Sequence, residues 1–381
     1  MNPSTTTYIS LGSNLGDRLH LLQDGIFQIN SRVGKVTKTS HVYETPAWGF
    51  DGDPFYNACI CVETQLSPPE LLEELLQIEV LLGRERKLIS GYASRTLDLD
   101  ILYYDKEILK TEHLEIPHPN LSKRRFVLRP LADIAPQFYH PIANKDTRNL
   151  LQECKDKSEI VRTPHKLYIN RTQLFSQLHF ISIEGNIGAG KTTLATKIGE
   201  DYNAKLVLER FADNAFLPKF YEDPARFAFP LEMSFLADRY QQFMDDTSQY
   251  DLFKNFMVSD YDIHKSLIFA KVTLQEEEFN LYRKLFHMMY KEVQRPRMFV
   301  YLYQNTERLI QNIKKRGRSY EQHIEGAYLE KINHGYFDYI KSFPEQNNLI
   351  IDISELDFVK NKEDYEHILY KIQQFAVQLS V

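Results

Sequence analysis

The sequence has little cysteine, a small net charge and no long apolar run. Three cysteines in 381 residues are too few for the disulfide framework of a secreted domain, so we expect a cytoplasmic location. The net charge of −6 gives no electrostatic reason to bind nucleic acid. No apolar run approaches the roughly 18 residues that a membrane span needs. The first ten residues, MNPSTTTYIS, lack a basic region before an apolar core, so no secretory signal is predicted.

The length and composition indicate a globular chain with more than one domain. With 43% hydrophobic and 26% charged residues, the composition is that of a folded protein, and 381 residues suffice for two or three domains. About 175 residues precede the glycine-rich motif described next, which is enough for a separate domain. We predict one domain over residues 1–165, a linker over 166–177 and a second domain over 178–381.

The segment FISIEGNIGAGKTTL, residues 180–194, fits G-x-x-x-x-G-K-[ST] between a β-branched apolar run and an amphipathic helix. Glycines let backbone N–H groups close around a phosphate, and the helix N-terminus adds partial positive charge. We expect Lys191 to reach the β/γ-phosphates of ATP and the Thr192 hydroxyl to hold Mg²⁺. The expected ATP-binding residues of this loop are Gly185, Asn186, Ile187, Gly188, Ala189, Gly190, Lys191, Thr192 and Thr193.

Two carboxylates stand close together in the first half, in the segment RTLDLDIL, residues 95–102. Side chains alternate along a strand, so Asp98 and Asp100 point to the same face. Neighbouring carboxylates repel each other unless a cation lies between them, and Mg²⁺ that bridges to nucleotide phosphates suits this pair. The basic residues nearby that would meet phosphate charge are Arg84, Arg86, Lys87 and Arg95. The spacing alone leaves open a solvated strand face with local salt bridges.

Several motifs of this half resemble 6-hydroxymethyl-7,8-dihydropterin pyrophosphokinase, a folate-pathway family, over residues 5–160. They are YISLGSNLG (8–16), YETP (43–46), FYN (55–57), GR (83–84), RTLDLDI (95–101) and IPHP (116–119). The resemblance implies a ferredoxin-like α+β fold. It also implies transfer of the terminal pyrophosphoryl unit of ATP to the hydroxymethyl oxygen of the pterin, with two Mg²⁺ held by the paired aspartates.

The same resemblance implies a role for each matching residue. The pterin pocket would be lined by Thr45, Pro46, Asn57 and Phe126, the last of which would stack on the pterin ring. The ATP side would hold Glu79, Arg84, Arg95 and His118, and Arg124 would reach phosphate from a mobile loop. The catalytic set would then be Asp98, Asp100, Arg84, Arg95 and Arg124. The loop after Thr45 carries the only tryptophan, Trp48, which either belongs to a lid or packs on the core.

Strand patterns alternate with helical patterns after the phosphate loop, at residues 206–208, 256–259, 298–303 and 349–353. Together with the strand before the loop, they predict an α/β domain with a five-stranded parallel sheet and ligands at the carboxyl ends of the strands. Acidic and basic residues fall at such ends or just beyond helices, namely Glu209, Asp260, Arg316 and Arg318. Phosphoryl transfer needs such a set: a phosphate cradle, a metal, a base and an arginine clamp.

The second half resembles the deoxynucleoside kinase family over residues 178–381. The matching segments are EGNIGAGKT (184–192), Glu209, DN (213–214), FL (216–217), KFYED (219–223) and RGR (316–318). The resemblance implies that Glu209 accepts the proton of the nucleoside 5′-hydroxyl and that Tyr221 binds the sugar 3′-hydroxyl. Arg316 and Arg318 would clamp the phosphates of ATP, with one Mg²⁺. A capping or surface glutamate is the alternative for Glu209, and a solvated helix end is the alternative for the two arginines.

Two departures from this family concern the nucleoside pocket. The family usually has an acidic residue, then arginine, then serine or tyrosine after the third strand, whereas this chain has Ser259-Asp260-Tyr261. Arg239 on the preceding helix is our candidate substitute for the missing arginine. The glutamine that reads the base is also not evident, and Glu232 is a candidate for its place. We expect a purine deoxynucleoside, deoxyadenosine, as the substrate, and the resemblance implies a homodimer formed through the kinase helices.

The sequence therefore predicts a bifunctional enzyme whose substrates are small molecules and whose two halves both use ATP as co-substrate with Mg²⁺. A second hypothesis is that the kinase-like half has lost catalysis and serves as a nucleotide-sensing or dimerisation module. The arginine missing near Asp260 favours it, whereas the intact Lys191, Thr192 and Glu209 argue against it. A third interpretation makes this half a nucleoside monophosphate kinase.

Overall fold

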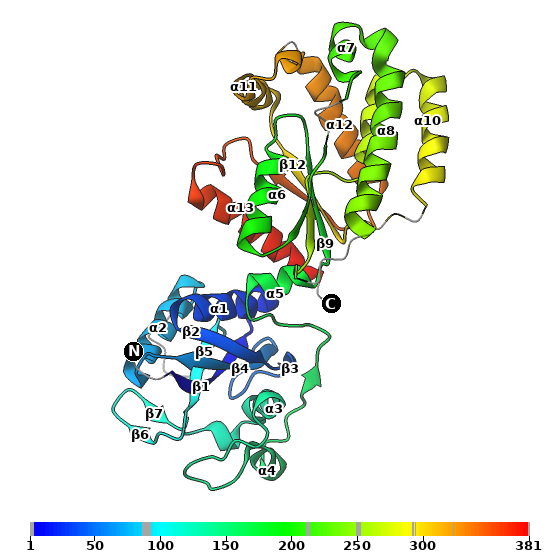
Figure 1. The fold of residues 1–381 in the computed structure, drawn as a ribbon. Helices are drawn as coiled ribbons and strands as arrows, with labels where there is room; N and C mark the ends of the chain where they lie inside the picture. The colour runs from blue at the N-terminus through cyan, green and yellow to red at the C-terminus, as the bar shows by residue number, and fades with distance from the viewer. Residues whose placement is uncertain are drawn as a thin grey trace. The chain divides into compact units, whose positions relative to one another are not determined.

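The computed structural model divides into two compact units at Leu174–Phe175, and each unit is described by itself (Figure 1). The described residues are 4–85, 93–210, 214–248, 253–291, 293, 295–322 and 324–379. The short helix α5 (Arg171–Ser176) spans the division point, which falls within the segment predicted to be a linker. Among the described residues, every helix is too short or too polar to cross a membrane.

The first unit is a mixed α/β layer structure on a six-stranded sheet of order β5-β1-β4-β3-β8, with β2 also paired to β4. The central strand pairings are antiparallel, as the predicted α+β class requires. Its strands are β1 (Thr5–Ser13), β2 (Gly34–Thr39), β3 (Tyr43–Thr45), β4 (Phe55–Thr64), β5 (Asp98–Tyr104) and β8 (Val161–Arg162), with the ribbon β6 (Leu109–Lys110) and β7 (Glu115–Ile116). Its helices are α1 (Arg18–Arg32), α2 (Pro68–Leu81), α3 (Arg125–Ile134) and α4 (Thr147–Glu153).

Helices cover both faces of this sheet, α1 and α2 on one face and α3 and α4 on the other (Figure 1). Local signals fix where they start: the Asp17 side chain caps α1, and Ser67 forms a capping box at the start of α2. Cys59 and Cys61 of β4 pack into the core below α3 and α4. Both thiols are buried and free.

The register of three strands brings distant residues into rows on the α3 side. Asp98 of β5 lies opposite Gly12 of β1, and Gly12 lies opposite Asn57 of β4. In the next such row, Asp100 lies opposite Ser10, and Ser10 opposite Cys59. Because side chains alternate along each strand, both rows face the same side. All of their residues except the core residue Cys59 line a pocket there.

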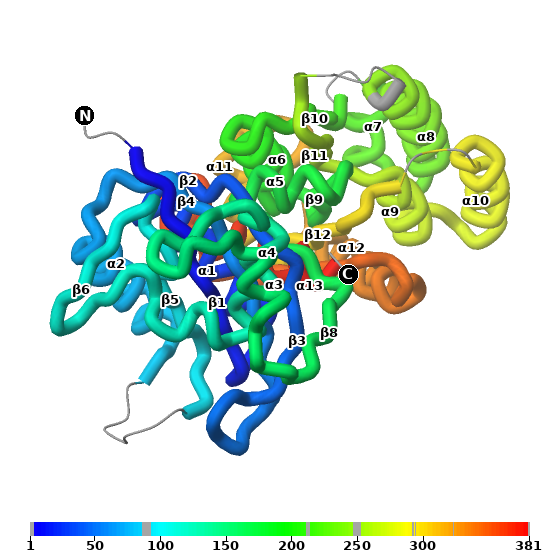
Figure 2. Tube along the Cα trace, turned by 90° about the horizontal axis from the view of Figure 1, so that it is seen from below, coloured from blue at the N-terminus to red at the C-terminus, as the bar shows by residue number. Residues whose placement is uncertain are grey.

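The second unit is built on a parallel sheet of five strands, of order β10-β11-β9-β12-β13, which confirms the predicted class. Figure 2 shows β10, β11, β9 and β12 following one another. The strands are β9 (Phe180–Gly185), β10 (Lys205–Val207), β11 (Met257–Ser259), β12 (Met298–Tyr303) and β13 (Asn348–Asp352). The helices are α6 (Lys191–Asp201), α7 (Leu217–Glu222), α8 (Pro224–Ser248), α9 (Lys265–Thr273), α10 (Glu276–Met289), α11 (Thr306–Arg316), α12 (Gly326–Ser342) and α13 (Lys362–Gln378).

Two sets of helices enclose this sheet. Helices α6 and α13 cover one face, and α8, α10 and α12 lie on the other (Figure 1). Phe180 of β9 packs in one core cluster with residues of α8 and α10, and Tyr301 of β12 packs in another with α9 and α12. The parallel strands place the phosphate loop after β9, Glu209 after β10 and Asp260 after β11 at the same edge of the sheet.

Candidate active sites

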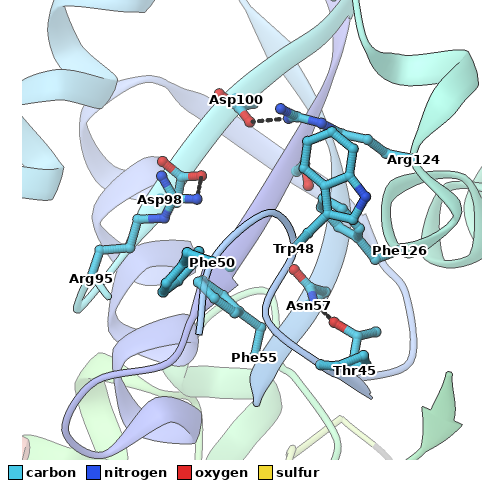
Figure 3. Close-up of a pocket in the computed structure, with 13 residues that line it drawn as sticks. Thr45, Trp48, Phe50, Phe55, Asn57, Arg95, Asp98, Asp100, Arg124 and Phe126 are labelled. Atoms are coloured by element: carbon cyan, nitrogen blue, oxygen red, sulfur yellow. Dashed lines mark hydrogen bonds and ion pairs between the residues drawn. The ribbon is translucent and has the colours of Figure 1, made fainter. Parts of the chain in front are cut away.

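A pocket in the first unit contains both aspartates (Figure 3). Its lining residues are Ser10, Gly12, Thr45, Pro46, Trp48, Phe50, Phe55, Asn57, Arg95, Asp98, Asp100, Arg124 and Phe126. One end of the pocket therefore carries the charged side chains of aspartates and arginines, and the other end carries aromatic rings and the amide of Asn57. This division suits a ligand with a charged part and a flat, partly polar part.

Arginines surround the two carboxylates at the charged end. Arg84 Nη1 lies 2.7 Å from Asp98 Oδ1, and Arg95 Nη2 lies 3.4 Å from Asp98 Oδ2. Arg124 Nη1 lies 3.9 Å from Asp100 Oδ2. Burial and the neighbouring Asp98 raise the pKa of Asp100 to about 7. A divalent cation between the carboxylates would lower that pKa, which makes this pair chemically suited to Mg²⁺.

The residues expected on the ATP side do not all line the pocket. Glu79 of α2 is 1% exposed and accepts a hydrogen bond of 2.8 Å from the Leu99 backbone N–H. It also forms an ion pair with Arg84, so it lies behind Arg84 and fixes that side chain against Asp98. His118 Nε2 is 4.0 Å from Asp100 Oδ2, and burial together with Arg124 lowers the pKa of His118 to about 4.

The aromatic end of the pocket surrounds Asn57. The Asn57 amide nitrogen donates to Thr45 Oγ1 at 2.8 Å, which orients the amide oxygen. That oxygen would lie 3.1 Å from a Cβ atom placed on Gly12, so a glycine here keeps the floor of the pocket open. The rings of Trp48 and Phe126 lie 6.3 Å apart, and the guanidinium of Arg124 approaches both (Figure 3). Trp48 is 36% exposed and lines the pocket.

The described residues contain no group of three or more histidine, cysteine, aspartate or glutamate side chains arranged to hold a metal ion. A Mg²⁺ at Asp98 and Asp100 would therefore take its remaining ligands from phosphate oxygens and water. Arg86, Lys87 and Asp213, which the sequence analysis singled out, lie outside the described residues.

The phosphate loop of the second unit has the backbone that a cradle for phosphate needs. Gly188 and Gly190 have φ values of +87° and +86°, which L side chains rarely adopt. Lys191 Nζ donates to Asn186 O at 2.9 Å and so folds back over the loop. Burial and the nearby Lys265 lower the pKa of Lys191 to about 8. Thr192 Oγ1 donates to Asp260 Oδ2 at 2.5 Å, so hydroxyl and carboxylate could share a Mg²⁺ ion.

The Glu209 carboxylate is held by two cations. Arg239 Nε lies 2.8 Å from Oε1, and Lys265 Nζ lies 2.6 Å from Oε2. Burial by itself would raise the pKa of Glu209, but Lys265 and Arg239 outweigh it and hold this pKa far below its usual range. The backbone N–H of Glu209 donates to Asp260 Oδ1 at 2.7 Å. Asp260 thereby connects the backbone of Glu209 to Thr192 of the phosphate loop.

Lys265 was missed by the sequence reasoning. It is the first residue of α9 and lies 56 positions after Glu209, so no local pattern pairs the two residues. Its side chain is 8% exposed. What marks Lys265 as a site residue is its burial, since lysines are usually solvated, and burial can be seen only in the folded structure.

Apolar and aromatic residues also line the pocket of the second unit that contains Glu209. Phe220, Leu231, Phe235, Phe269 and Tyr328 contribute to it, together with the predicted residues Tyr221 and Glu232. Tyr221 stacks on Tyr320, with ring centroids 6.3 Å apart. Burial raises the pKa of Tyr221 well above its usual value. A flat ligand with a few polar edges would suit this part of the pocket.

Arg316, the last residue of α11, and Arg318 just beyond it also line this pocket. Arg316 Nε donates to Glu321 Oε2 at 3.1 Å, and Arg318 Nη1 donates to Glu321 Oε1 at 3.2 Å. Glu321 is 5% exposed, so this glutamate fixes both guanidinium groups. It was missed as well, because a single acidic residue in a polar segment carries no pattern of its own.

Comparison with known proteins assigns each unit. Residues 8–136 match the 7,8-dihydro-6-hydroxymethylpterin-pyrophosphokinase (HPPK) family, and residues 181–377 match the deoxynucleoside kinase family. The 2-amino-4-hydroxy-6-hydroxymethyldihydropteridine pyrophosphokinase of Porphyromonas gingivalis is 43% identical over 141 residues, 36% of this chain and 94% of that protein. The deoxyguanosine kinase of Bacillus subtilis is 38% identical over 203 residues, 52% of this chain and 98% of that protein.

A solved structure of deoxyadenosine kinase from M. mycoides with bound dATP is 26% identical and covers 51% of this chain and 98% of that chain, with a TM-score of 0.45. The family matches account separately for the two units and confirm the two resemblances drawn from the motifs. The chain therefore belongs to the 7,8-dihydro-6-hydroxymethylpterin-pyrophosphokinase family through its first unit and to the deoxynucleoside kinase family through its second.

Proposed function

We propose that the chain is a bifunctional enzyme with two working active sites. The first unit transfers the pyrophosphoryl group of ATP to the hydroxymethyl oxygen of 6-hydroxymethyl-7,8-dihydropterin and releases AMP. The second transfers the γ-phosphoryl group of ATP to the 5′-hydroxyl of a purine deoxynucleoside, deoxyadenosine being our expected substrate, and releases ADP. The observation that carries the second assignment is Glu209, whose carboxylate is held in the pocket by Arg239 and Lys265 and whose backbone N–H is connected through Asp260 to the phosphate loop.

In the first unit, the charged end of the pocket is proposed to bind the phosphates and the aromatic end the pterin. Asp98 and Asp100 would hold Mg²⁺, which would neutralise phosphate charge and orient the reacting groups. Arg95 and Arg124 would stabilise the charge on the transferred group. Asn57, oriented by Thr45, would read a polar edge of the pterin, as buried amides do for flat heterocycles.

The pterin ring is proposed to lie between the aromatic residues at the far end of the pocket. Phe126 and Trp48 both contribute rings there. Arg124 approaches both rings and Asp100, so one side chain connects the pterin side of the pocket with the phosphate side. This contact would let pterin binding influence the position of the arginine during transfer.

In the second unit, Glu209 would accept a hydrogen bond from the nucleoside 5′-hydroxyl and take its proton as the oxygen attacks. The two cations keep this carboxylate ionised, so it is a weak base whose main contribution is orientation. That suffices for phosphoryl transfer, whose transition state is loose and depends mostly on positioning and charge stabilisation. Lys191, Arg316 and Arg318 would supply that positive charge around the phosphates. A Mg²⁺ at Thr192 and Asp260 would neutralise phosphate charge there.

Arg239 is proposed to replace the arginine that is absent from Ser259-Asp260-Tyr261, and Lys265 acts with it. Both side chains contact Glu209, and Arg239 also donates to Ser266 Oγ at 2.9 Å. Arg239 of α8 and Lys265 of α9 thus make the contacts to the Glu209 carboxylate that an arginine after β11 would make. This replacement supports a catalytic second unit over the nucleotide-sensing alternative.

A substrate screen on the full-length protein with Mg-ATP tests both proposals. The candidates are hydroxymethyl-dihydropterin, the four deoxynucleosides and their monophosphates, with AMP and ADP measured separately. We expect AMP with the pterin and ADP with purine deoxynucleosides. AMP with the pterin but no ADP with any acceptor would favour the nucleotide-sensing alternative, and ADP only with monophosphates would make the second unit a monophosphate kinase.

A further inference from the structure

A buried carboxylate in the second unit, that of Glu232, has one oxygen without a hydrogen-bond partner among the described residues. Glu232 of α8 lines the pocket and is 2% exposed. Thr273 Oγ1 donates to its Oε1 at 3.0 Å. Within the described part of the chain, Oε2 has no hydrogen-bond partner. An unpaired buried oxygen is costly, so an oxygen in this position is suited to a polar group of the ligand.

The hydrogen bond from Thr273 decides what each oxygen can do. Thr273 Oγ1 also lies 3.0 Å from the Phe269 carbonyl oxygen, and a hydroxyl has one proton to donate. When that proton is donated to Oε1, Oε1 acts as an acceptor, and the proton of a neutral Glu232 lies on Oε2. The neutral side chain then presents a donor and an acceptor side by side, as a glutamine does. The ionised side chain presents two acceptors.

Adenine and guanine differ in the hydrogen-bonding groups that would meet the two forms of Glu232. Adenine has its N6 amino donor next to the ring nitrogens N1 and N7, which are acceptors, so it pairs with a donor and an acceptor side by side. Guanine presents two neighbouring donors, the ring N1–H and the N2 amino group, and these pair with two acceptors. No edge of adenine has two adjacent donor groups, so a carboxylate that is ionised cannot form two hydrogen bonds to it.

We propose that the protonation state of Glu232 selects the purine, the neutral acid favouring deoxyadenosine and the carboxylate favouring deoxyguanosine. This inference rests on the proposed function, since it requires that the second unit phosphorylate purine deoxynucleosides. It adds that one residue reads both bases and that the preference between them depends on pH.

The surroundings of Glu232 place its ionisation near neutral pH. Burial raises the pKa of Glu232 to about 7, against the opposing effect of Arg239. Lys265 and Thr273 of α9 also favour the ionised form, and Glu209 opposes it. The tyrosines that interact with this carboxylate come from three further helices and are Tyr221, Tyr282 and Tyr328. Their pKa values are raised by burial, so they stay neutral across the range in which Glu232 titrates.

The test is a competition between the two nucleosides on the full-length protein. Equal concentrations of deoxyadenosine and deoxyguanosine are offered with saturating Mg-ATP at pH values from 6 to 8, and the ratio of dAMP to dGMP is measured at low conversion. This ratio reports relative kcat/KM, so effects of pH on groups that serve both substrates cancel. If each form of Glu232 accepts only its own purine, the ratio falls about tenfold per pH unit, or about 100-fold across the range.

Glu232→Gln provides the decisive variant, because the amide keeps the donor and acceptor of the neutral acid and cannot ionise. We expect it to retain deoxyadenosine phosphorylation, to lose deoxyguanosine phosphorylation and to show no dependence of the ratio on pH. Glu277→Gln on α10, an exposed position, is the matched control and should keep the parent profile. Melting curves of both variants establish that they are folded.

Three outcomes would overturn the inference. A product ratio that stays constant from pH 6 to 8 in the parent protein shows that Glu232 does not select the purine by its protonation. The same conclusion follows if Glu232→Gln retains the pH dependence of the parent. If the parent phosphorylates neither nucleoside, the proposed function itself fails, which is distinguishable from a constant ratio with active enzyme.

Discussion

Replacing Lys265 by methionine tests the assignment of Glu209 directly. The Nζ–Oε2 distance of 2.6 Å corresponds to a Coulomb attraction of about 6 kcal/mol at an effective dielectric constant near 20. Most of this attraction is offset because burying the ammonium group costs several kcal/mol. Glu209 also keeps Arg239 as a partner, so it is not left unpaired. The free energy of unfolding of the second unit should therefore fall by only about 1–3 kcal/mol.

The larger effect of Lys265→Met should be on acid–base behaviour. Losing one adjacent cation raises the pKa of a carboxylate by about 1–3 units, so the acid limb of kcat/KM for the deoxynucleoside should move to higher pH by that amount. Glu209 has a lowered pKa in the folded protein, and its stabilising effect is present above its unfolded pKa and lost as pH falls through the folded value. The difference in melting temperature between parent and variant should accordingly be largest near neutral pH and decrease in acid.

The assay is ADP release with the preferred deoxynucleoside from pH 2.5 to 8, because the Glu209 pKa lies far below its usual range; AMP release by the first unit is the internal control. Lys271→Met on the same helix is the matched variant, because Lys271 is 58% exposed and its ion pair with Asp338 is long, at 3.5 Å. Such a pair contributes at most about 1 kcal/mol. A pH profile of Lys265→Met that superimposes on the parent profile would refute the claim that this lysine controls Glu209.

The remaining predictions use each activity as the control for the other. Protons compete with Mg²⁺ at Asp100, whose pKa is raised to about 7 by burial and by Asp98, so half-maximal AMP release should need about tenfold more Mg²⁺ at pH 6 than at pH 8. An unchanged requirement in a Mg²⁺ titration would contradict this. Gly12→Ala should push Asn57 aside and raise the KM for the pterin about tenfold, a cost of ~1.4 kcal/mol, with ADP release unaffected. Glu321→Gln should raise the KM for ATP in ADP release about tenfold, because two guanidinium groups lose their anchor; a lower KM would show that Glu321 competes with phosphate instead.

Patterns confined to a short segment were predicted well from the sequence. The strand–loop–helix at residues 180–194 and the alternation of strands and helices after it appear in the structure. So does the α+β class of the first unit, which the motifs implied through their resemblance to a family. Asp98 and Asp100 line one pocket, as a period of two along one strand requires. These features depend on residues a few positions apart, so they can be inferred before folding.

Contacts between distant segments were not predictable in the same way. The sequence reasoning expected Glu79 on the ATP side but gave no sign of its contacts, which are an ion pair with Arg84 and a hydrogen bond accepted from the Leu99 N–H. Arg239 was suggested as a partner for the nucleoside site, but nothing in the sequence indicated Lys265 as the second cation on Glu209. Which charged side chains become buried together depends on helix packing, and an isolated charge has no periodicity that reveals it.

The sequence by itself determined the two families, the phosphate loop and the residue types of both sites, because these are encoded in local spacing and in motifs. Only the tertiary structure decided which groups hold the site side chains in place. Strand register puts Gly12 between Asp98 and Asn57, and helix packing brings Lys265 and Arg239 to Glu209. Burial then sets the protonation of Asp100 and Glu232. Desolvation and pairing across long sequence separations exist only once the chain has folded.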